Sequence, residues 1–150
     1  MKTRIKWIEA VTFMGHTEGG NSVIMDGPPE HGGRNLGPRP MELLLMGMGG
    51  CTAFDVVHIL TKGRQAITDC VVDIEASRAA EDPKVFTRIH LHFLVTGTQL
   101  SENAVKRAIA LSAEKYCSAS IMLGKTAEIT HDYEIIEASK SGAFSGEGGK

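Results

Sequence analysis

The sequence lacks the features that mark most nucleic-acid-binding proteins. It has no long basic run, and 18 Asp and Glu residues slightly outnumber 16 Lys and Arg, which gives a formal net charge of -2. Aromatic residues make up only 5% of the chain, whereas proteins that stack on bases need aromatic side chains and a positive surface. We therefore expect no nucleic-acid partner.

Cysteine is also scarce, with residues at positions 51, 70 and 117 only. An odd number of cysteines argues against a secreted scaffold held by disulfides. The sequence also shows no signal-peptide pattern, which is a cationic start followed by an apolar core and a cleavage site. A chain of 150 residues buries enough surface on folding to need neither disulfides nor a structural metal. We expect one compact domain in a reducing, cytoplasmic setting.

Only one segment, residues 43–60, is long and apolar enough to be compared with a membrane span, and it contains Thr52, Asp55 and His58. Asp55 at a bilayer centre would cost about 2.5–3.5 kcal/mol, and no aromatic belt flanks the segment. We interpret the segment as a helix buried in a protein or a dimer, and we expect no membrane partner.

Periodicity and turn residues predict the order of elements. Alternating or β-branched segments are predicted strands: 5–13 and 22–25, paired as a hairpin, then 70–77, 85–95 and 127–136. Segments with helical spacing are predicted helices: 40–62 ended by Gly63, 101–116 capped by Ser101, and a short turn at 118–123. Residues 27–40, rich in Gly and Pro, are a predicted loop. Mostly antiparallel pairing makes the fold class α+β.

The apolar central helix predicts a homodimer. One sheet covers one face of such a helix and leaves the other in water. Gly47 and Gly50 lie on one helical face with Gly49 beside them, and each costs about 1 kcal/mol of helix propensity. Glycines that destabilise a helix indicate that another backbone approaches closely at these positions. We expect that backbone to belong to a second copy of the helix.

Cys51 on the central helix and Cys117 at the end of the later helix are the main candidates for chemistry. If the two helices adjoin, these thiols can act as a nucleophile and its resolving partner. The alternative is that both are small core residues, which is also the interpretation for Cys70. Asp55, one turn after Cys51, raises the pKa of that thiol unless a cation offsets it. Four arginines could supply that cation: Arg34, Arg39, Arg78 and Arg88.

Two further patterns leave alternatives open. Glu42, in the first turn of the helix, can orient an arginine or simply favour the helix dipole. His90 and His92 lie on one face of a predicted strand and could bind zinc together with Cys51, Asp55 or His58, or simply make that face polar.

Several short runs resemble the OsmC/Ohr family: Pro40-Met41-Glu42-Leu43-Leu44-Leu45, Gly47, Gly49-Gly50-Cys51, Asp55-Val56-Val57 and Glu114-Lys115-Tyr116-Cys117-Ser118. The match covers residues 1–137 and looks closest to the YhfA-like branch. It excludes a Gly- and Ser-rich tail, 138–150, that we expect to be disordered. The resemblance implies an intertwined homodimer in which curved sheets enclose two central helices, with active sites at the interface.

Family members of known activity are thiol peroxidases that reduce organic hydroperoxides, and their two cysteines match Cys51 and Cys117. The resemblance implies that the Cys51 thiolate attacks the peroxide and becomes a sulfenic acid, and that Cys117 then closes a disulfide. A dithiol reductant would reset the pair, and neither a metal nor an organic cofactor is implied.

Two departures from the family concern activation of the thiolate. The organic-hydroperoxide branch has a glutamate directly after the proline, where this chain has Met41 and places the acid at Glu42, about 100° further around the helix. The arginine of the N-terminal hairpin is replaced by His16, Thr17 and Glu18. The activating cation is therefore unassigned.

The leading hypothesis is a stress-protective peroxidase for small, aromatic or lipid hydroperoxides. Its predicted interface pocket is lined by Met41, Leu44, Leu45, Met48 and Phe54, with Glu42 as a further substrate-binding residue. The competing hypothesis is a noncatalytic protein that binds an apolar ligand in the same pocket. Thiol-based acyl transfer or hydrolysis is a third possibility, but no supporting Cys-His-Asp motif is present.

Overall fold

The computed structural model describes residues 1–139, so most of the predicted tail lies outside the described residues. The chain divides into two compact units, Met1–Met48 and Gly49–Lys150. Each unit contains one three-stranded sheet, and three of the four strand pairs are antiparallel. The predicted α+β class is confirmed.

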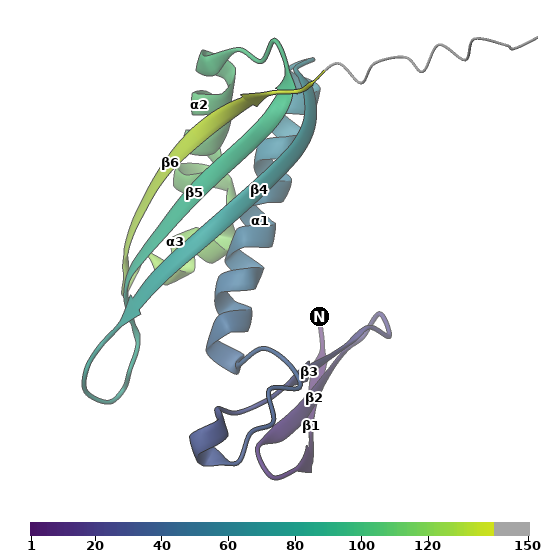
Figure 1. Ribbon diagram of the computed structural model, residues 1–150, viewed down its shortest axis with the longest axis vertical. Coiled ribbons are helices and arrows are strands. Elements are labelled where there is room, and N and C mark those ends of the chain that lie inside the picture. Colours follow the sequence, from purple (N-terminus) through teal and green to yellow (C-terminus); the bar gives the residue numbers. More distant parts are fainter. Residues whose placement is uncertain (140–150) are drawn as a thin grey trace, which may run out of the picture. The chain divides into compact units, whose positions relative to one another are not determined.

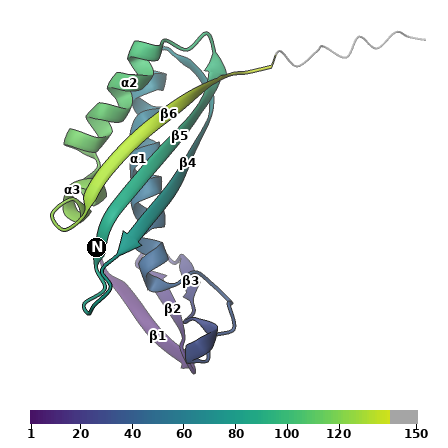
Figure 2. The same cartoon turned by 60° about the vertical axis from the view of Figure 1, so that its left-hand side comes forward.

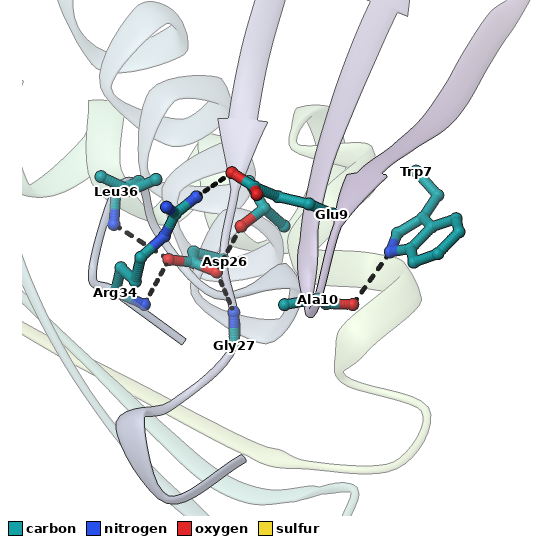
Figure 3. Close-up of polar contacts among 8 residues, drawn as sticks. Trp7, Glu9, Ala10, Asp26, Gly27, Arg34 and Leu36 are labelled. Carbon is teal, nitrogen blue, oxygen red and sulfur yellow. Dashed lines mark hydrogen bonds and ion pairs between the residues drawn. The ribbon is translucent and has the colours of Figure 1, made fainter. Parts of the chain in front are cut away.

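The first sheet has the order β1-β2-β3, with β1 at Thr3–Glu9, β2 at Thr12–Thr17 and β3 at Ser22–Met25 (Figure 1). The prediction of a single strand over 5–13 is wrong, because the chain turns at Ala10, whose φ is 42°. The Trp7 indole N–H holds this turn by donating to the Ala10 carbonyl over 2.9 Å (Figure 3).

A buried carboxylate organises the loop that follows β3, which contains one short 3₁₀ turn at Pro29–His31. Asp26 is 1% exposed and accepts backbone N–H groups from Gly27, Arg34 and Leu36 at 3.0, 2.8 and 3.1 Å (Figure 3). The Thr12 hydroxyl donates a fourth hydrogen bond over 3.1 Å. These donors, the Leu36 and Arg34 amides foremost, hold the pKa of Asp26 below its usual value.

Helix α1, Pro40–Lys62, has the predicted bounds, and it continues from the first unit into the second. Its buried residues form a stripe with a spacing of four: Met48, Thr52, Val56 and Leu60. Large apolar residues off this stripe are exposed within the chain: Leu44, Met46, Phe54 and Val57. By length and composition α1 also qualifies as a membrane span. Gly63 follows its last residue, but Arg64, with a φ of 57°, adopts the left-handed conformation at this end.

The second sheet consists of long, curved strands in the order β4-β5-β6 (Figure 1). Strand β4, Ala66–Arg78, is antiparallel to β5, Phe86–Thr98, and β5 is parallel to β6, Glu128–Glu137. The buried residues of β5 alternate along the strand and form one face of the sheet: Ile89, Leu91, Phe93 and Val95. The second-unit part of α1 and the later helices lie together on one side of this sheet (Figure 2).

Helix α2, Glu102–Leu111, begins at the predicted cap, because the Ser101 hydroxyl accepts the Ala104 N–H at 3.4 Å. It widens into a π-helical turn at Ser112–Tyr116, and α3 follows at Ser118–Leu123. Within this unit α1 packs tightly on β4, since a Cβ added at Gly49 would lie 2.8 Å from the Ile74 side chain. Gly47 and Gly50 face open space, so their predicted contact with a second copy stays a prediction.

Candidate functional site

The π-helical turn after α2 sets the position of Cys117. The backbone N–H of Cys117 donates to the Ser112 carbonyl over 2.9 Å and closes this wide turn. Cys117 is then the N-cap residue of α3, and it is fully buried. π-Helical turns are rare and frequently occur at functional sites, because they redirect the side chains that follow.

The structure brings the two predicted cysteines together with an acidic residue. The ligand atoms of Cys51, Asp55 and Cys117 lie within 4.8 Å of one another. Cys51 is half-buried on α1, and all three cysteines of the chain are present as thiols. The sequence predicted a reactive pair only if the two helices adjoined, and in the second unit they do.

Polar groups at the start of α3 act on both sulfur atoms. Cys117 Sγ accepts the Ser120 backbone N–H at 3.4 Å and the Ser120 hydroxyl at 3.1 Å. The backbone N–H of Ala119, also at the start of α3, acts to lower the pKa of Cys51. Donors of this kind stabilise negative charge on sulfur and fix the direction in which each side chain points.

The surroundings of Cys51 nevertheless disfavour its thiolate. Burial raises the pKa of the Cys51 thiol above the ordinary 9.0, and Cys117 and the Asp55 carboxylate raise it further. The Ala119 N–H opposes this rise. No cation is among the largest influences on this pKa within residues 1–139. At neutral pH the isolated chain therefore holds Cys51 mainly as the thiol.

A chain of hydroxyl groups holds Asp55 in place. The Ser112 hydroxyl donates to Asp55 Oδ2 over 2.9 Å, and Thr52 Oγ1 lies 2.8 Å from Ser112 Oγ. Because Ser112 gives its hydrogen to Asp55, Thr52 is left to donate to Ser112. Sequence reasoning did not identify Thr52 and Ser112 as site residues. The available signal was that each is a hydroxyl residue at an otherwise apolar position, Thr52 on α1 and Ser112 at the end of α2.

The four arginines considered as activators of Cys51 all have other partners. Arg34 pairs with Glu9, Arg39 with Glu42 at 3.2 Å and Arg88 with Glu128 at 3.9 Å, while Arg78 Nε donates to the Lys84 carbonyl at 2.6 Å. None of these four contacts involves Cys51 or Cys117, so within residues 1–139 none of the four arginines is assigned as the activator of Cys51.

Glu42 has a local structural role at the start of α1. Its carboxylate accepts the Arg39 backbone N–H at 2.8 Å and pairs with the Arg39 guanidinium. Of the two interpretations of Glu42, the contact agrees with the one in which Glu42 orients an arginine, and its position in the first turn of α1 is also compatible with the other, a favourable effect on the helix dipole. Its role in substrate binding stays a prediction.

The predicted pocket residues are distributed along α1. Met41 and Leu45 are half-buried, whereas Phe54 is 69% exposed and stacks on His58 with ring centroids 5.8 Å apart. In the first unit, an apolar hollow of about 290 Å³ is lined mainly by residues of the first sheet, including Ile5, Val23 and Met25, and by Leu43 of α1. The predicted lining residues Met41, Leu45 and Phe54 are not part of it.

The histidines considered as zinc ligands make a different cluster. His92 Nδ1 lies 2.5 Å from Asp132 on the neighbouring strand β6, and His90 Nε2 lies 3.4 Å from the same carboxylate. The bond to Asp132 raises the pKa of His92. Within residues 1–139 the group with metal-ligand spacing is Cys51, Asp55 and Cys117, so the combination of these histidines with Cys51 is not formed.

Comparison with known proteins gives the family. Residues 32–132 match the family model described as OsmC-like protein. Protein YhfA of Escherichia coli K12 is 49% identical over 138 residues, covering 92% of this chain and all of YhfA. A hypothetical protein from Aquifex aeolicus VF5 is 28% identical, with a TM-score of 0.80 and coverage of 92% of this chain and 97% of its own.

A more distant likeness concerns an organic hydroperoxide resistance protein OsmC from Legionella pneumophila, 19% identical, with a TM-score of 0.65. The match covers 89% of this chain and 97% of the Legionella chain. At 19% identity, this likeness shows only that the two proteins share a fold. The family model and the relative at 49% identity together show that this chain belongs to the OsmC-like protein family.

Proposed function

We propose that the protein is a thiol peroxidase that reduces organic hydroperoxides, with Cys51 as the reactive cysteine and Cys117 as the resolving cysteine. The observation that carries the proposal is the position of Cys117 beside Cys51, although the two residues are far apart in the sequence. A disulfide requires such proximity. Membership of a family that includes organic hydroperoxide resistance proteins adds support.

The proposed reaction uses the two thiols and no cofactor. The Cys51 thiolate attacks the distal peroxide oxygen, so that an S–O bond forms, the O–O bond breaks, and the alkoxide takes up a proton to leave as alcohol. The Cys117 sulfur then displaces hydroxide from the sulfenic acid, which forms the disulfide and releases water. The net change is dithiol plus hydroperoxide to disulfide, alcohol and water, and an external dithiol restores the thiols.

We also propose that the protein works as a homodimer. Helix α1 carries large apolar side chains that are exposed in the single chain, and Gly47 and Gly50 leave open space on it; the exposed residues are Leu44, Met46, Phe54 and Val57. A second copy would bury these side chains. It would also change the surroundings of Cys51, on whose pKa no cation of residues 1–139 is among the largest influences.

The test is product analysis after one equivalent of cumene hydroperoxide, on protein kept free of metal by a chelator. Wild type should yield one cumyl alcohol and one Cys51–Cys117 disulfide per chain. Cys117→Ser should yield a trappable Cys51 sulfenic acid, and Cys51→Ser should yield no alcohol, whereas Cys70→Ser should behave as wild type. Full alcohol yield from Cys51→Ser, or a disulfide that involves Cys70, would overturn the proposal.

The hollow beside the first sheet supports a second candidate function, the binding of an apolar small ligand without chemistry. Its apolar lining and its volume of about 290 Å³ suit a short acyl chain or an aromatic ring. Calorimetric titration of Cys51→Ser with decanoate tests this. Binding that Val23→Asp abolishes would support the binding function, and no heat at millimolar decanoate would reject it.

A further inference from the structure

We propose that Cys51, Asp55 and Cys117 form a binding site for a thiophilic divalent cation, for which Zn²⁺ is the probe. The two sulfur atoms and a carboxylate oxygen lie within 4.8 Å of one another inside the second unit. The inference does not depend on peroxidase activity, because it needs only the positions of these three side chains.

The spacing is close to that of a tetrahedral zinc site. With Zn–S near 2.3 Å and Zn–O near 2.1 Å, tetrahedral ligand atoms lie about 3.4–3.8 Å apart. The three ligand atoms are already within 4.8 Å, so modest side-chain rotations bring them to coordinating distance. Three protein ligands leave the fourth position to water, as in zinc sites that remain open.

The ligands are held by hydrogen bonds from outside the site. Ser112 donates to the Asp55 carboxylate, and Thr52 in turn supports Ser112. Ser120 donates twice to the Cys117 sulfur through its N–H and its hydroxyl. Such outer contacts orient metal ligands and reduce the rearrangement that binding requires. The three supporting residues belong to three different elements: Thr52 to α1, Ser112 to the π-helical turn and Ser120 to α3.

The charge and chemistry of the ligands favour a soft cation over Mg²⁺ or Ca²⁺. Binding converts two thiols and one carboxylate into two thiolates and one carboxylate, so two protons leave to solvent for each Zn²⁺ bound. The ligand charge of about -3 is then largely offset by the metal. Thiolates select Zn²⁺ and similar ions, whereas Mg²⁺ and Ca²⁺ prefer oxygen-only sites.

Occupancy of this site has a consequence for the cysteines. A metal bound by both sulfur atoms uses the electron pairs with which Cys51 would attack a peroxide and Cys117 would form a disulfide. Zn²⁺ and hydroperoxide therefore compete for the same pair, and the bound metal protects both thiols from oxidation.

The experiment titrates fully reduced, chelator-washed full-length protein with Zn²⁺ in competition with a coloured chelator, and with Co²⁺ as an optical probe. We expect one metal per chain, release of two protons, and a near-ultraviolet sulfur-to-cobalt band. Cys51→Ser and Cys117→Ser should each lose the band, and Asp55→Asn should weaken Zn²⁺ binding by at least about tenfold. Cys70→Ser is the matched control and should bind as wild type.

Three results would overturn the inference: a band that survives in Cys51→Ser, a band lost in Cys70→Ser, or no Zn²⁺ bound by wild type at micromolar concentration. If Cys117→Ser does not fold, two milder variants still test the inference. Cys51→Ser changes a partly exposed residue and Asp55→Asn is nearly isosteric, and both are measured by the same cobalt band and Zn²⁺ affinity. Failure here leaves the peroxidase proposal intact, because that assay runs in chelator. A peroxidase failure likewise leaves metal binding to be measured on its own.

Discussion

Ser112, on the π-helical turn, donates a hydrogen bond of 2.9 Å to Asp55, one turn after Cys51 on α1. The bond fixes a negative charge beside a half-buried thiol, and that charge helps to raise the pKa of Cys51. The carboxylate therefore opposes the nucleophile while it completes the proposed metal site. Substitutions at Asp55 separate these two effects.

Asp55→Asn should make Cys51 more reactive in the metal-free protein. Loss of the carboxylate charge lowers the pKa of the thiol, and the Asn oxygen can still accept the Ser112 hydrogen bond. Asp55 is the weakest of the named influences on this pKa, so we expect the alkylation rate at pH 7 to rise by less than about tenfold, which is the change in thiolate that one pKa unit would give. Iodoacetamide kinetics with mass-spectrometric assignment measure it. Asp73→Asn, at an exposed position of β4, is the control, and an unchanged rate in Asp55→Asn would refute the argument.

The peroxide reaction should accelerate with pH across the neutral range. Burial raises the pKa of Cys51 above 9.0, so the thiolate is the minor form at pH 7 and its fraction grows about tenfold per pH unit below the pKa. Stopped-flow rates of sulfenic acid formation in Cys117→Ser between pH 6 and 9 test this. A rate that is flat above pH 6 would contradict this prediction. It would mean that a cation from outside the described residues, 1–139, has lowered the pKa of Cys51.

Local patterns in the sequence were enough to place most of the elements. The apolar run that starts at Pro40 predicted the extent of α1, and Ser101 marked the start of α2. The turn at Ala10 escaped prediction because alanine carries no turn preference, and a tertiary contact from Trp7 holds it there. The left-handed residue after α1 is Arg64 and not Gly63, although glycine has the lower cost in that conformation.

The candidate site was predictable only as a list of residues. The types and family positions of Cys51 and Cys117 identified them, but their contact depends on how α1 meets the π-helical turn. That turn has the same apolar spacing as an ordinary helix end, so periodicity could not reveal it. The Thr52–Ser112–Asp55 hydrogen bonds join residues about sixty positions apart, and no local pattern encodes such pairs.

Asp26 should make stability of the first unit depend on acidity. Its hydrogen bonds lower its pKa in the folded state, so its contribution is present above the unfolded value of about 3.9 and is lost as pH falls through the folded value. Asp26→Asn should lower the melting temperature by several degrees at pH 7. The difference in melting temperature between wild type and Asp26→Asn should become smaller below pH 4. Glu30→Gln, at an exposed position of the same loop, is the control. A difference in melting temperature that does not change with pH would exclude the charge of the Asp26 carboxylate as the cause of the stabilisation.

A charge placed at an exposed apolar position of α1 should separate the proposed dimer. Phe54 is 69% exposed in the single chain, and a second copy that covers it would have to desolvate a glutamate introduced there. We expect wild type to elute as a dimer and Phe54→Glu as a folded monomer, by size-exclusion chromatography with light scattering and by circular dichroism. Thr61→Glu, an exposed position near the end of the same helix, should remain dimeric. A monomeric wild type would contradict the proposed dimer, because the exposed apolar side chains of α1 would then stay in water.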